Sequence, residues 1–169
     1  MRQTAHGICL RDTRERRGSD VMRFCIQVVK QAAVDIDGVR KASIGAGMLV
    51  LAGIGKDDDE KTADKMIAKL LKMRIFSDEN GKTNLSISDI DGEILLVSQF
   101  TLYADCRHGN RPSFTDSMGP MRAEELYNYI AGSIRPQVRK LETGVFGADM
   151  QVSLINDGPF TVILDSADI

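Results

Sequence analysis

The stretch DMQVSLINDGPFTVILD, residues 149–165, decides how the second half of this sequence folds. Its two apolar halves, DMQVSLI and FTVILD, are typical of strands, and the Asn, Asp, Gly and Pro between them are typical of a turn. A hairpin needs only two turn residues, whereas Pro159 cannot donate a hydrogen bond to the next strand. The pattern therefore predicts two strands, with either a proline that ends a strand or a segment of backbone presented to another molecule.

Strand-like segments dominate the rest of the sequence from Met22 onward. Asp37-Gly38 between two of them is a strong hairpin signal. Residues 58–74 and 121–134 change to helical period, because their apolar residues recur at intervals of three and four. Consecutive strands outnumber helices, which favours an α+β fold with hairpins over a repeated β-α-β unit. The other predicted strands are RFCIQVV, AAVDID, VRKASI, MLVLAGI and EILLVSQF.

Composition restricts the class of protein. A chain of 169 residues is long enough for one domain with a substantial core, and a net charge of −2 argues against a general polyanion binder, so any nucleic-acid contact must come from a local patch. The three cysteines are far apart and odd in number, which argues against a disulfide framework and fits a reducing, cytoplasmic location. No run of about 18 apolar residues is present, so we expect no membrane span.

The first 21 residues differ from the remainder. They contain five arginines among polar residues and show neither helical nor strand period. Acidic residues argue against a transit peptide, and the apolar segment of a signal peptide is missing. We therefore predict a disordered N-terminal extension over 1–21 and a single domain over 22–169.

The sequence offers few residues for acid–base or metal chemistry. Of its two histidines, His6 lies in the extension and His108 in a predicted loop, so a Ser-His-Asp or Cys-His site would depend on His108. Cys106 and His108 lack two further ligands at a recognised spacing, and we predict no metal site. The acidic run 57–60 is expected to be a solvated helix start.

Glycine-rich stretches do not predict a nucleotide cofactor either. GAGMLV lacks the third glycine of a dinucleotide-binding fingerprint, and Gly55-Lys56 is followed by Asp57 where a phosphate-binding loop requires Ser or Thr. We predict no cofactor.

Polar residues interrupt apolar strands at two places, 98–101 (SQFT) and 156–161 (NDGPFT). Each could be an ordinary strand end hydrogen-bonded to the other. Together they favour a polar cleft with hydroxyls, amides and exposed main chain but no strong general base. Such a site could stabilise an oxyanion through backbone N–H groups and would take its base from water or from the substrate.

From Met22 to Asp165 the sequence resembles the D-aminoacyl-tRNA deacylase family, also described as D-tyrosyl-tRNA(Tyr) deacylases. Both family signatures, SQxT and NxGPxT, stand intact and in order, each at a predicted strand end. The resemblance implies antiparallel-rich sheets forming a sandwich or partial barrel, with two main helices packed on one side. The stretches that carry it are GIGKDD (53–58), LLVSQFTL (95–102), RPSF (111–114), GVFGADMQV (144–152) and NDGPFT (156–161).

The resemblance implies a homodimeric editing hydrolase with no cofactor, no membrane attachment and no obligatory protein partner. It would cleave the ester between a D-amino acid, or glycine mischarged on tRNA-Ala, and the terminal adenosine of tRNA, releasing free amino acid and tRNA. In this family the Gly-Pro peptide is cis and reaches into the other subunit's active site, where it rejects L-aminoacyl-tRNA by steric clash with the L side chain. Because enantiomers carry identical groups, selectivity of this kind must come from geometry.

The same resemblance implies the residues of the site. Main-chain N–H groups near Phe100 and Thr101 would polarise the ester carbonyl, and the ribose 2′-hydroxyl of the substrate would stand in for a side-chain base. The implied catalytic residues are Ser98, Gln99, Phe100 and Thr101. The implied substrate-binding residues are Asn156, Gly158, Pro159, Thr161, Phe146 and Met150.

The first strand departs from the family pattern. The family reads Gln-Arg-Val and its arginine is thought to brace the Gly-Pro element, whereas this sequence has valine at Val28. A related family with a trans Gly-Pro tolerates L-amino acids, so relaxed chirality is one alternative. Because both signatures are retained, we predict a cis Gly158-Pro159 bond supported by Arg23 or Lys30.

Two basic stretches and two other functions complete the expectations. Arg107, His108 and Arg111 form a small basic loop suited to tRNA phosphates, whereas the stripe of Lys61, Lys65 and Lys69 fits a solvated helix face better. A DNA-binding protein associated with replication is an alternative, because some eukaryotic relatives are linked to replication origins. The acidic pI and the lack of a DNA-binding motif argue against it, and the intact signatures argue against an inactive paralogue.

Overall fold

The computed structural model describes residues 21–169. The predicted extension therefore lies outside the described residues except for its last member, Val21. Val21 is buried, and its carbonyl oxygen accepts a hydrogen bond of 2.6 Å from the hydroxyl of Tyr103. The folded domain thus includes at least one residue that the sequence analysis assigned to the extension.

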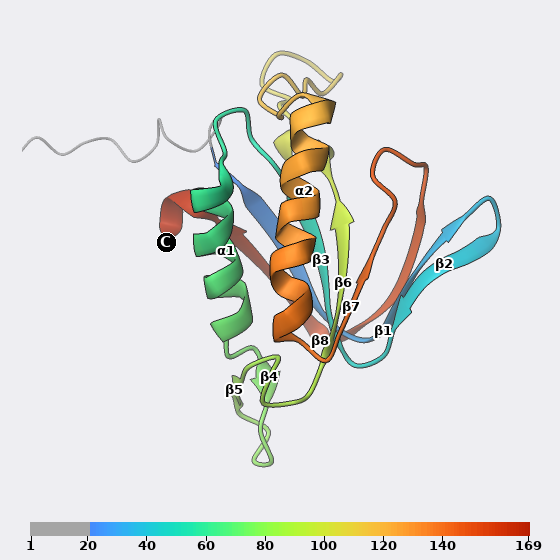
Figure 1. Cartoon of the computed structure of the whole chain (residues 1–169), viewed down its shortest axis with the longest axis vertical. Coiled ribbons are helices and arrows are strands. Elements are labelled where there is room, and N and C mark those ends of the chain that lie inside the picture. Colours follow the sequence, from blue (N-terminus) through green and yellow to red (C-terminus); the bar gives the residue numbers. More distant parts are fainter. Residues whose placement is uncertain (1–20) are drawn as a thin grey trace, which may run out of the picture.

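One six-stranded sheet forms the centre of the molecule (Figure 1). Five strands follow the order β2-β1-β3-β6-β7, and the sixth, β8, pairs with β1. The pairs of β3 with β6 and of β6 with β7 are parallel, and the others are antiparallel. A small second sheet joins β4 (Phe76–Ser77) and β5 (Thr83–Leu85). The strands of the main sheet are β1 (Arg23–Ile36), β2 (Val39–Ile44), β3 (Gly47–Gly53), β6 (Glu93–Ser98), β7 (Lys140–Thr143) and β8 (Gln151–Asp165).

The predicted hairpin is present between β1 and β2. Asp37 and Gly38 both have positive φ, 50° and 75°. The two-residue turn whose twist best matches that of the flanking strands requires positive φ at both central residues. Asp-Gly is favoured at these positions, which is why this pair predicts the turn.

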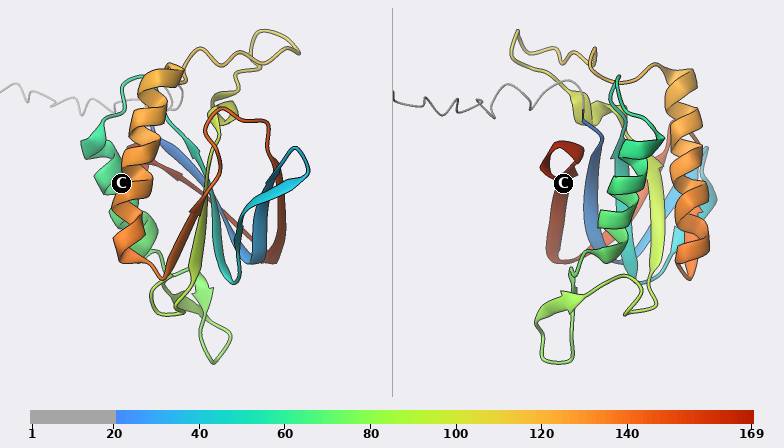
Figure 2. Two further views of the ribbon diagram at one scale, coloured as in Figure 1. Left: turned by 45° about the vertical axis from the view of Figure 1, so that its right-hand side comes forward. Right: turned by 60° about the vertical axis from the view of Figure 1, so that its left-hand side comes forward.

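Two helices, α1 (Glu60–Lys72) and α2 (Pro120–Ile134), cover one face of the sheet (Figures 1 and 2). The side chain of Asp59 caps α1 by accepting a hydrogen bond of 2.7 Å from the Thr62 N–H, and Pro120 opens α2. Both helices lie where the periodicity places them. The α+β fold with two helices on one side is therefore confirmed.

Apolar side chains are buried on both faces of the sheet. Toward the helices, Phe24, Met48 and Leu96 pack against Met66 and Leu126. On the opposite face a second cluster gathers around β1, β2, β3 and β6, which explains the uninterrupted apolar run in β6. Members of this second cluster are Val29, Ala32, Val34, Ala42, Ile44, Leu49, Leu95 and Val97.

The two strands predicted at 149–165 are in fact a single strand, β8, that follows β1 along its length. Thr161 pairs with Gln27 and Asn156 pairs with Val29, so residues 157–160 oppose only one residue of β1. The turn prediction for NDGP was wrong, because these residues bulge out of a continuous strand and do not reverse the chain.

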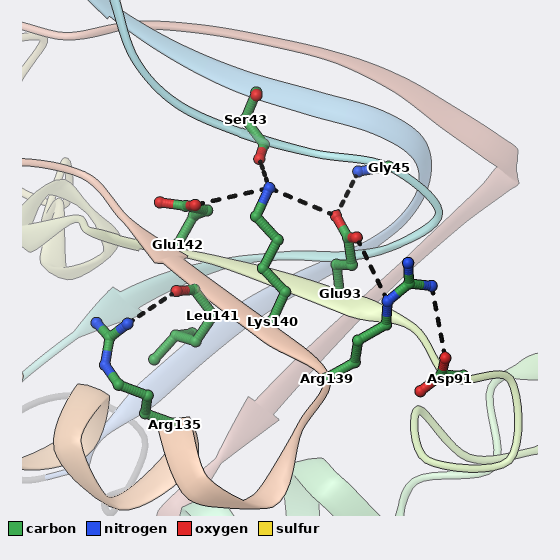
Figure 3. A network of polar contacts seen from close by, with 9 residues as sticks. All are labelled: Ser43, Gly45, Asp91, Glu93, Arg135, Arg139, Lys140, Leu141 and Glu142. Atoms are coloured by element: carbon green, nitrogen blue, oxygen red, sulfur yellow. Dashed lines mark hydrogen bonds and ion pairs between the residues drawn. The ribbon is translucent and has the colours of Figure 1, made fainter.

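A network of polar contacts closes the end of the sheet opposite to the SQFT segment (Figure 3). The Glu93 carboxylate accepts a hydrogen bond of 2.8 Å from the Gly45 N–H, and the Lys140 ammonium donates to the Ser43 carbonyl at 2.8 Å. Glu93 and Lys140 open β6 and β7, so the network fastens the turn between β2 and β3 to both parallel strands. At Gly47 an added Cβ would lie 1.8 Å from the Glu93 carbonyl oxygen, so only glycine fits there.

Candidate functional site

The SQFT segment lies at the carboxyl end of β6. Ser98 is the last residue of the strand, and Gln99 precedes the short 3-10 helix η1 (Phe100–Tyr103). The Gln99 N–H donates to the Ala52 carbonyl of β3 at 2.8 Å, and the Gln99 side-chain amide donates to the Thr101 hydroxyl. The first N–H groups of a helix have no partner within it, so those of Phe100 and Thr101 can donate to a group outside η1.

A pocket of about 370 Å³ opens beside this segment. Its walls are mostly apolar and come from β3, from the residues before and at the start of α2, and from the loop after β7. Four of the residues implied by the resemblance meet there: Ser98, Gln99, Phe100 and Phe146. Phe146 packs against the Tyr127 ring, with centroids 5.8 Å apart, and the buried Tyr127 hydroxyl donates to the Leu96 carbonyl at 2.8 Å.

Met150 lies away from this pocket in the single chain. Its side chain packs against the cluster on the other face of the sheet. Thr101 is exposed at the rim of the site and is absent from the pocket lining. Neither residue therefore belongs to the pocket wall of a single chain.

Arg23 supports the backbone of η1. One guanidinium nitrogen donates to the Leu102 carbonyl at 2.9 Å, and two others donate to the Asp165 carboxylate at 2.7 and 3.2 Å. The hydrogen-bonded Asp165 carboxylate raises the pKa of Arg23 further, so the guanidinium stays charged. The prediction that Arg23 braces the Gly-Pro element was wrong within one chain, because Arg23 pairs with Asp165 and its guanidinium contacts Asp165 and Leu102, whereas the bulge opposes Val28.

Asp58 is a buried carboxylate that the sequence analysis missed. Its side chain accepts a hydrogen bond of 2.6 Å from the Gly55 N–H, and it lies beside the Tyr103 hydroxyl at the base of η1. Burial raises the pKa of Asp58 to about 6, although hydrogen bonds from the backbone N–H groups of Gly55 and Met22 oppose the shift. The prediction of a solvated acidic run was wrong for this one member, since Asp58 is only 6% exposed.

Asn156 holds the NDGPFT bulge together. Its side-chain oxygen accepts a hydrogen bond of 2.6 Å from the Phe160 N–H, and its side-chain amide donates to the Thr161 hydroxyl at 3.3 Å. Gly158 and Pro159 between these contacts are exposed, and the peptide bond that joins them is cis, as we expected. Gly158 has a φ of +148°, and an added Cβ would lie 2.9 Å from the Phe160 nitrogen. Glycine is therefore required at this position.

Lys30 contributes little to the support of the bulge. Its ammonium lies 3.7 Å from the Asp157 carboxylate, and both side chains are more than half exposed. Exposed ion pairs contribute at most about 1 kcal/mol. Val28, where the family has arginine, is buried in the core toward the helices. Asn156, which the sequence analysis assigned to substrate binding, is the main internal support.

The two signatures do not meet within one chain. Thr161 pairs with Gln27, which pairs with Leu49, which pairs with Leu95, three residues before Ser98. Three strand spacings of about 4.8 Å and three residues of about 3.3 Å separate Thr161 from Ser98 by roughly 17 Å. The single polar cleft predicted from both signatures is therefore not formed by one copy of the chain.

The basic loop after η1 is partly neutralised. The Arg107 guanidinium donates two hydrogen bonds to the Asp105 carboxylate, at 2.6 and 2.8 Å, and lowers the pKa of that carboxyl far below its usual range. Arg111 is exposed, and no ion pair of Arg111 is found within residues 21–169. Of the two residues predicted to contact phosphate, Arg111 is thus the better placed.

Neither a metal-binding cluster nor a membrane-spanning helix is found in residues 21–169. In that range no group of three or more His, Cys, Asp or Glu side chains is arranged to bind a metal ion. Of the helices described there, none has both the length and the apolar character to cross a membrane.

Comparison with known proteins identifies the family. The model of the D-Tyr-tRNA(Tyr) deacylase family matches residues 25–165. The chain belongs to the D-Tyr-tRNA(Tyr) deacylase family. Relatives named D-aminoacyl-tRNA deacylase include one from Thermosipho africanus, 51% identical over 88% of this chain and 99% of its own length. Another, from Lactobacillus acidophilus, is 53% identical over 85% of this chain and 99% of its own length.

Solved structures of this deacylase fold agree. The c-Myc DNA Unwinding Element Binding Protein is 40% identical and superimposes with a TM-score of 0.80, covering 84% of this chain and 97% of that one. A probable eukaryotic D-amino acid tRNA deacylase superimposes with a TM-score of 0.77 at 17% identity, over 86% of this chain and 99% of that one. The second likeness supports the fold alone.

Proposed function

We propose that this protein is a D-aminoacyl-tRNA deacylase that works in the cytoplasm. The observation that carries the proposal is the η1 backbone, whose leading N–H groups lie at the end of β6 beside a pocket of about 370 Å³ that contains Ser98, Gln99 and Phe100. The activity named for relatives more than 50% identical over most of the chain supports it. The ester carbonyl of a bound aminoacyl-tRNA is the group that such donors would polarise.

The proposed chemistry requires no side-chain nucleophile. Water attacks the ester carbonyl while the N–H groups of Phe100 and Thr101 bind the developing oxyanion. The C–O bond to the ribose then breaks, and the neighbouring 2′-hydroxyl of the substrate shuttles the proton. The Thr101 hydroxyl accepts a hydrogen bond from the Gln99 amide, and no histidine contacts it within the described residues. We therefore assign the catalytic role at this position to the main chain.

The selectivity we propose depends on a second copy of the chain. Thr161, two residues after the exposed Gly158-Pro159 segment, lies roughly 17 Å from Ser98 of its own chain by strand spacing, so the segment would contact the SQFT segment of a partner subunit. A rigid backbone segment at that place leaves no space for an L side chain, whereas a D side chain points elsewhere. Glycine has no side chain to exclude, so glycyl-tRNA-Ala is a further proposed substrate.

A direct test measures release of amino acid from D-tyrosyl-, L-tyrosyl- and glycyl-tRNA by the purified protein. We expect hydrolysis of the D-tyrosyl and glycyl substrates and little of the L-tyrosyl substrate. Hydrolysis of none of them would overturn the function, and equal hydrolysis of both enantiomers would overturn the selectivity.

The role of the main chain can be tested with a matched pair of variants. Phe100→Pro removes the Phe100 N–H, and Gln99 has φ −147° and ψ 82°, outside the α region that a following proline disfavours. Phe100→Leu keeps the N–H. Loss of one oxyanion donor costs about 100- to 1,000-fold in kcat. Equal activity of the proline and leucine variants would contradict the assigned role.

Mixing of inactive subunits tests the shared site. Phe100→Pro and Gly158→Val are each expected to be inactive alone. After random exchange, half of the dimers combine both variants and contain one intact site of two, so about a quarter of wild-type activity should return. Absence of any recovery, with exchange verified by mass spectrometry, would show that each site belongs to one chain.

Binding of DNA is a second candidate function, favoured by the 40% identity to the c-Myc DNA Unwinding Element Binding Protein. Affinity for duplex and single-stranded DNA at physiological salt, measured beside deacylation, separates the two functions. The net charge of −2 and the neutralised Arg107 favour deacylation.

A further inference from the structure

A pair of aromatic rings, one exposed and one half-buried, flanks the pocket. Phe100 is 58% exposed although it belongs to the anchored helix η1, and it meets Phe114 edge to face, with ring centroids 5.2 Å apart and an interplanar angle of 75°. In such an arrangement the edge of one ring covers only part of the other, so apolar ring surface remains open to solvent. Neither ring belongs to the two core clusters of the sheet.

The backbone around Phe114 is held in place on both sides. Before it, Asp105 and Ser113 exchange two backbone hydrogen bonds, of 2.8 and 2.9 Å, that close the basic loop. After it, the N–H and the hydroxyl of Ser117 both donate to the Phe114 carbonyl, at 3.1 and 2.8 Å. The ring pair is therefore assembled from two fixed segments and needs no ligand to form.

The ring pair is continuous with the proposed active site. Phe100 lines the pocket together with Ser98 and Gln99, so the ring that faces solvent on one side borders the reaction site on the other. Arg111, exposed and two residues before the Ser113 bridge, adds a positive charge to the same loop. Rigid aromatic surface with a nearby cation is the arrangement by which proteins bind unpaired nucleotides.

We propose that the Phe100–Phe114 pair stacks against the base of the nucleotide that precedes the terminal adenosine of tRNA. The inference rests on the proposed function, which places the terminal ester in the pocket. The single-stranded 3′ end must then leave the pocket past Phe100, and its next base meets the open rings while Arg111 faces the phosphate. The pair thus lengthens the recognised substrate from one nucleotide to two.

Substrates of increasing length test this inference with the wild-type protein. The D-tyrosyl esters of adenosine, of the trinucleotide CCA and of the same trinucleotide with an abasic middle position are compared. Stacking on aromatic side chains typically contributes enough per base to change kcat/KM by roughly 5- to 150-fold. CCA should exceed both the adenosine ester and the abasic trinucleotide by such a factor. Equal values for CCA and the abasic trinucleotide would overturn the inference.

Phe114→Leu locates the effect on the protein, with Phe114→Tyr and Tyr129→Leu as matched controls. Tyr129 is 37% exposed on α2, and the substitution removes an aromatic ring outside the site. Phe114→Leu should lose roughly fivefold or more on CCA and tRNA esters and change less than about twofold on the adenosine ester. Phe114→Tyr keeps the ring and should hydrolyse the CCA, tRNA and adenosine esters as wild type does.

Two results would refute the assignment. An equal loss of activity by Phe114→Leu on the CCA, tRNA and adenosine esters would show that Phe114 only supports the pocket wall. A monomeric Phe114→Leu variant in sedimentation would place the rings at a subunit interface. Failure of the deacylase function itself is distinguishable, because wild-type protein would then hydrolyse no ester of the series.

Discussion

The buried carboxylate of Asp58 should make the stability of this protein decrease as pH rises. Burial raises the pKa of Asp58 from an ordinary 3.8 to about 6 in the folded state. The folded chain therefore holds this proton more tightly than the unfolded chain does. The stabilisation is complete below about pH 3.8, is lost as the pH rises toward 6, and stays absent above that value.

The magnitude follows from the two pKa values. A difference of about 2 units at 1.36 kcal/mol per unit corresponds to about 3 kcal/mol of unfolding free energy. Asp58→Asn removes the titration and keeps an oxygen that can accept from the Gly55 N–H. The variant should therefore gain about 3 kcal/mol relative to wild type between pH 4 and pH 8.

Urea unfolding of both proteins at each pH measures this difference, because other titrating groups are common to both and cancel. Asp57→Asn, at the exposed neighbouring residue, is the control and should stay within about 0.5 kcal/mol of wild type. A flat difference between wild type and Asp58→Asn from pH 4 to pH 8 would refute the reasoning. An increase in the unfolding free energy of wild type relative to Asp58→Asn as pH rises would also refute it.

Three further outcomes are expected. Thr101→Ala should retain activity within about tenfold of wild type in steady-state deacylation, because the hydroxyl is only an acceptor from a neighbouring amide, and a covalent aminoacyl-Thr101 intermediate would contradict this. Asn156→Ala should lower the ratio of D- to L-tyrosyl-tRNA hydrolysis by about fivefold or more, because the bulge loses the acceptor of the Phe160 N–H, whereas an unchanged ratio would show that this contact is dispensable. Deletion of residues 1–20 should leave the melting temperature and deacylation unchanged, since the sequence shows no helical or strand period before Met22, and loss of dimerisation would show that the extension takes part in the structure.

Features set by a few neighbouring residues could be predicted from the sequence. Asp37-Gly38 requires positive φ at both positions, and the helical period over 121–134 places an apolar face on α2 whatever it packs against. The pocket residues Ser98, Gln99 and Phe100 were also found, because a strand end with a recognised signature places them together.

Features set by distant parts of the chain could not be predicted. NDGP is typical of a turn locally, yet pairing with β1 on both sides keeps β8 continuous and converts the turn into a bulge. Asp58 stands among four acidic residues, and only the packing of Tyr103 and Gly55 around it shows that it is buried. The separation of the two signatures depends on strand order, which no short motif encodes.

The ion pair between Arg23 and Asp165 has a consequence for the time at which the protein becomes competent during synthesis. These residues are 142 positions apart, and the same guanidinium fixes the Leu102 carbonyl of η1. Most of the domain therefore leaves the ribosome before Asp165, the residue that holds the Arg23 guanidinium in place, has been synthesised. Until β8 has been synthesised, β1 lacks this pairing partner, and such long-range pairing is slow to form. A nascent chain is thus expected to leave the aminoacyl-tRNAs around its own ribosome untouched, because the backbone that would act on them is fastened only after translation has passed Asp165.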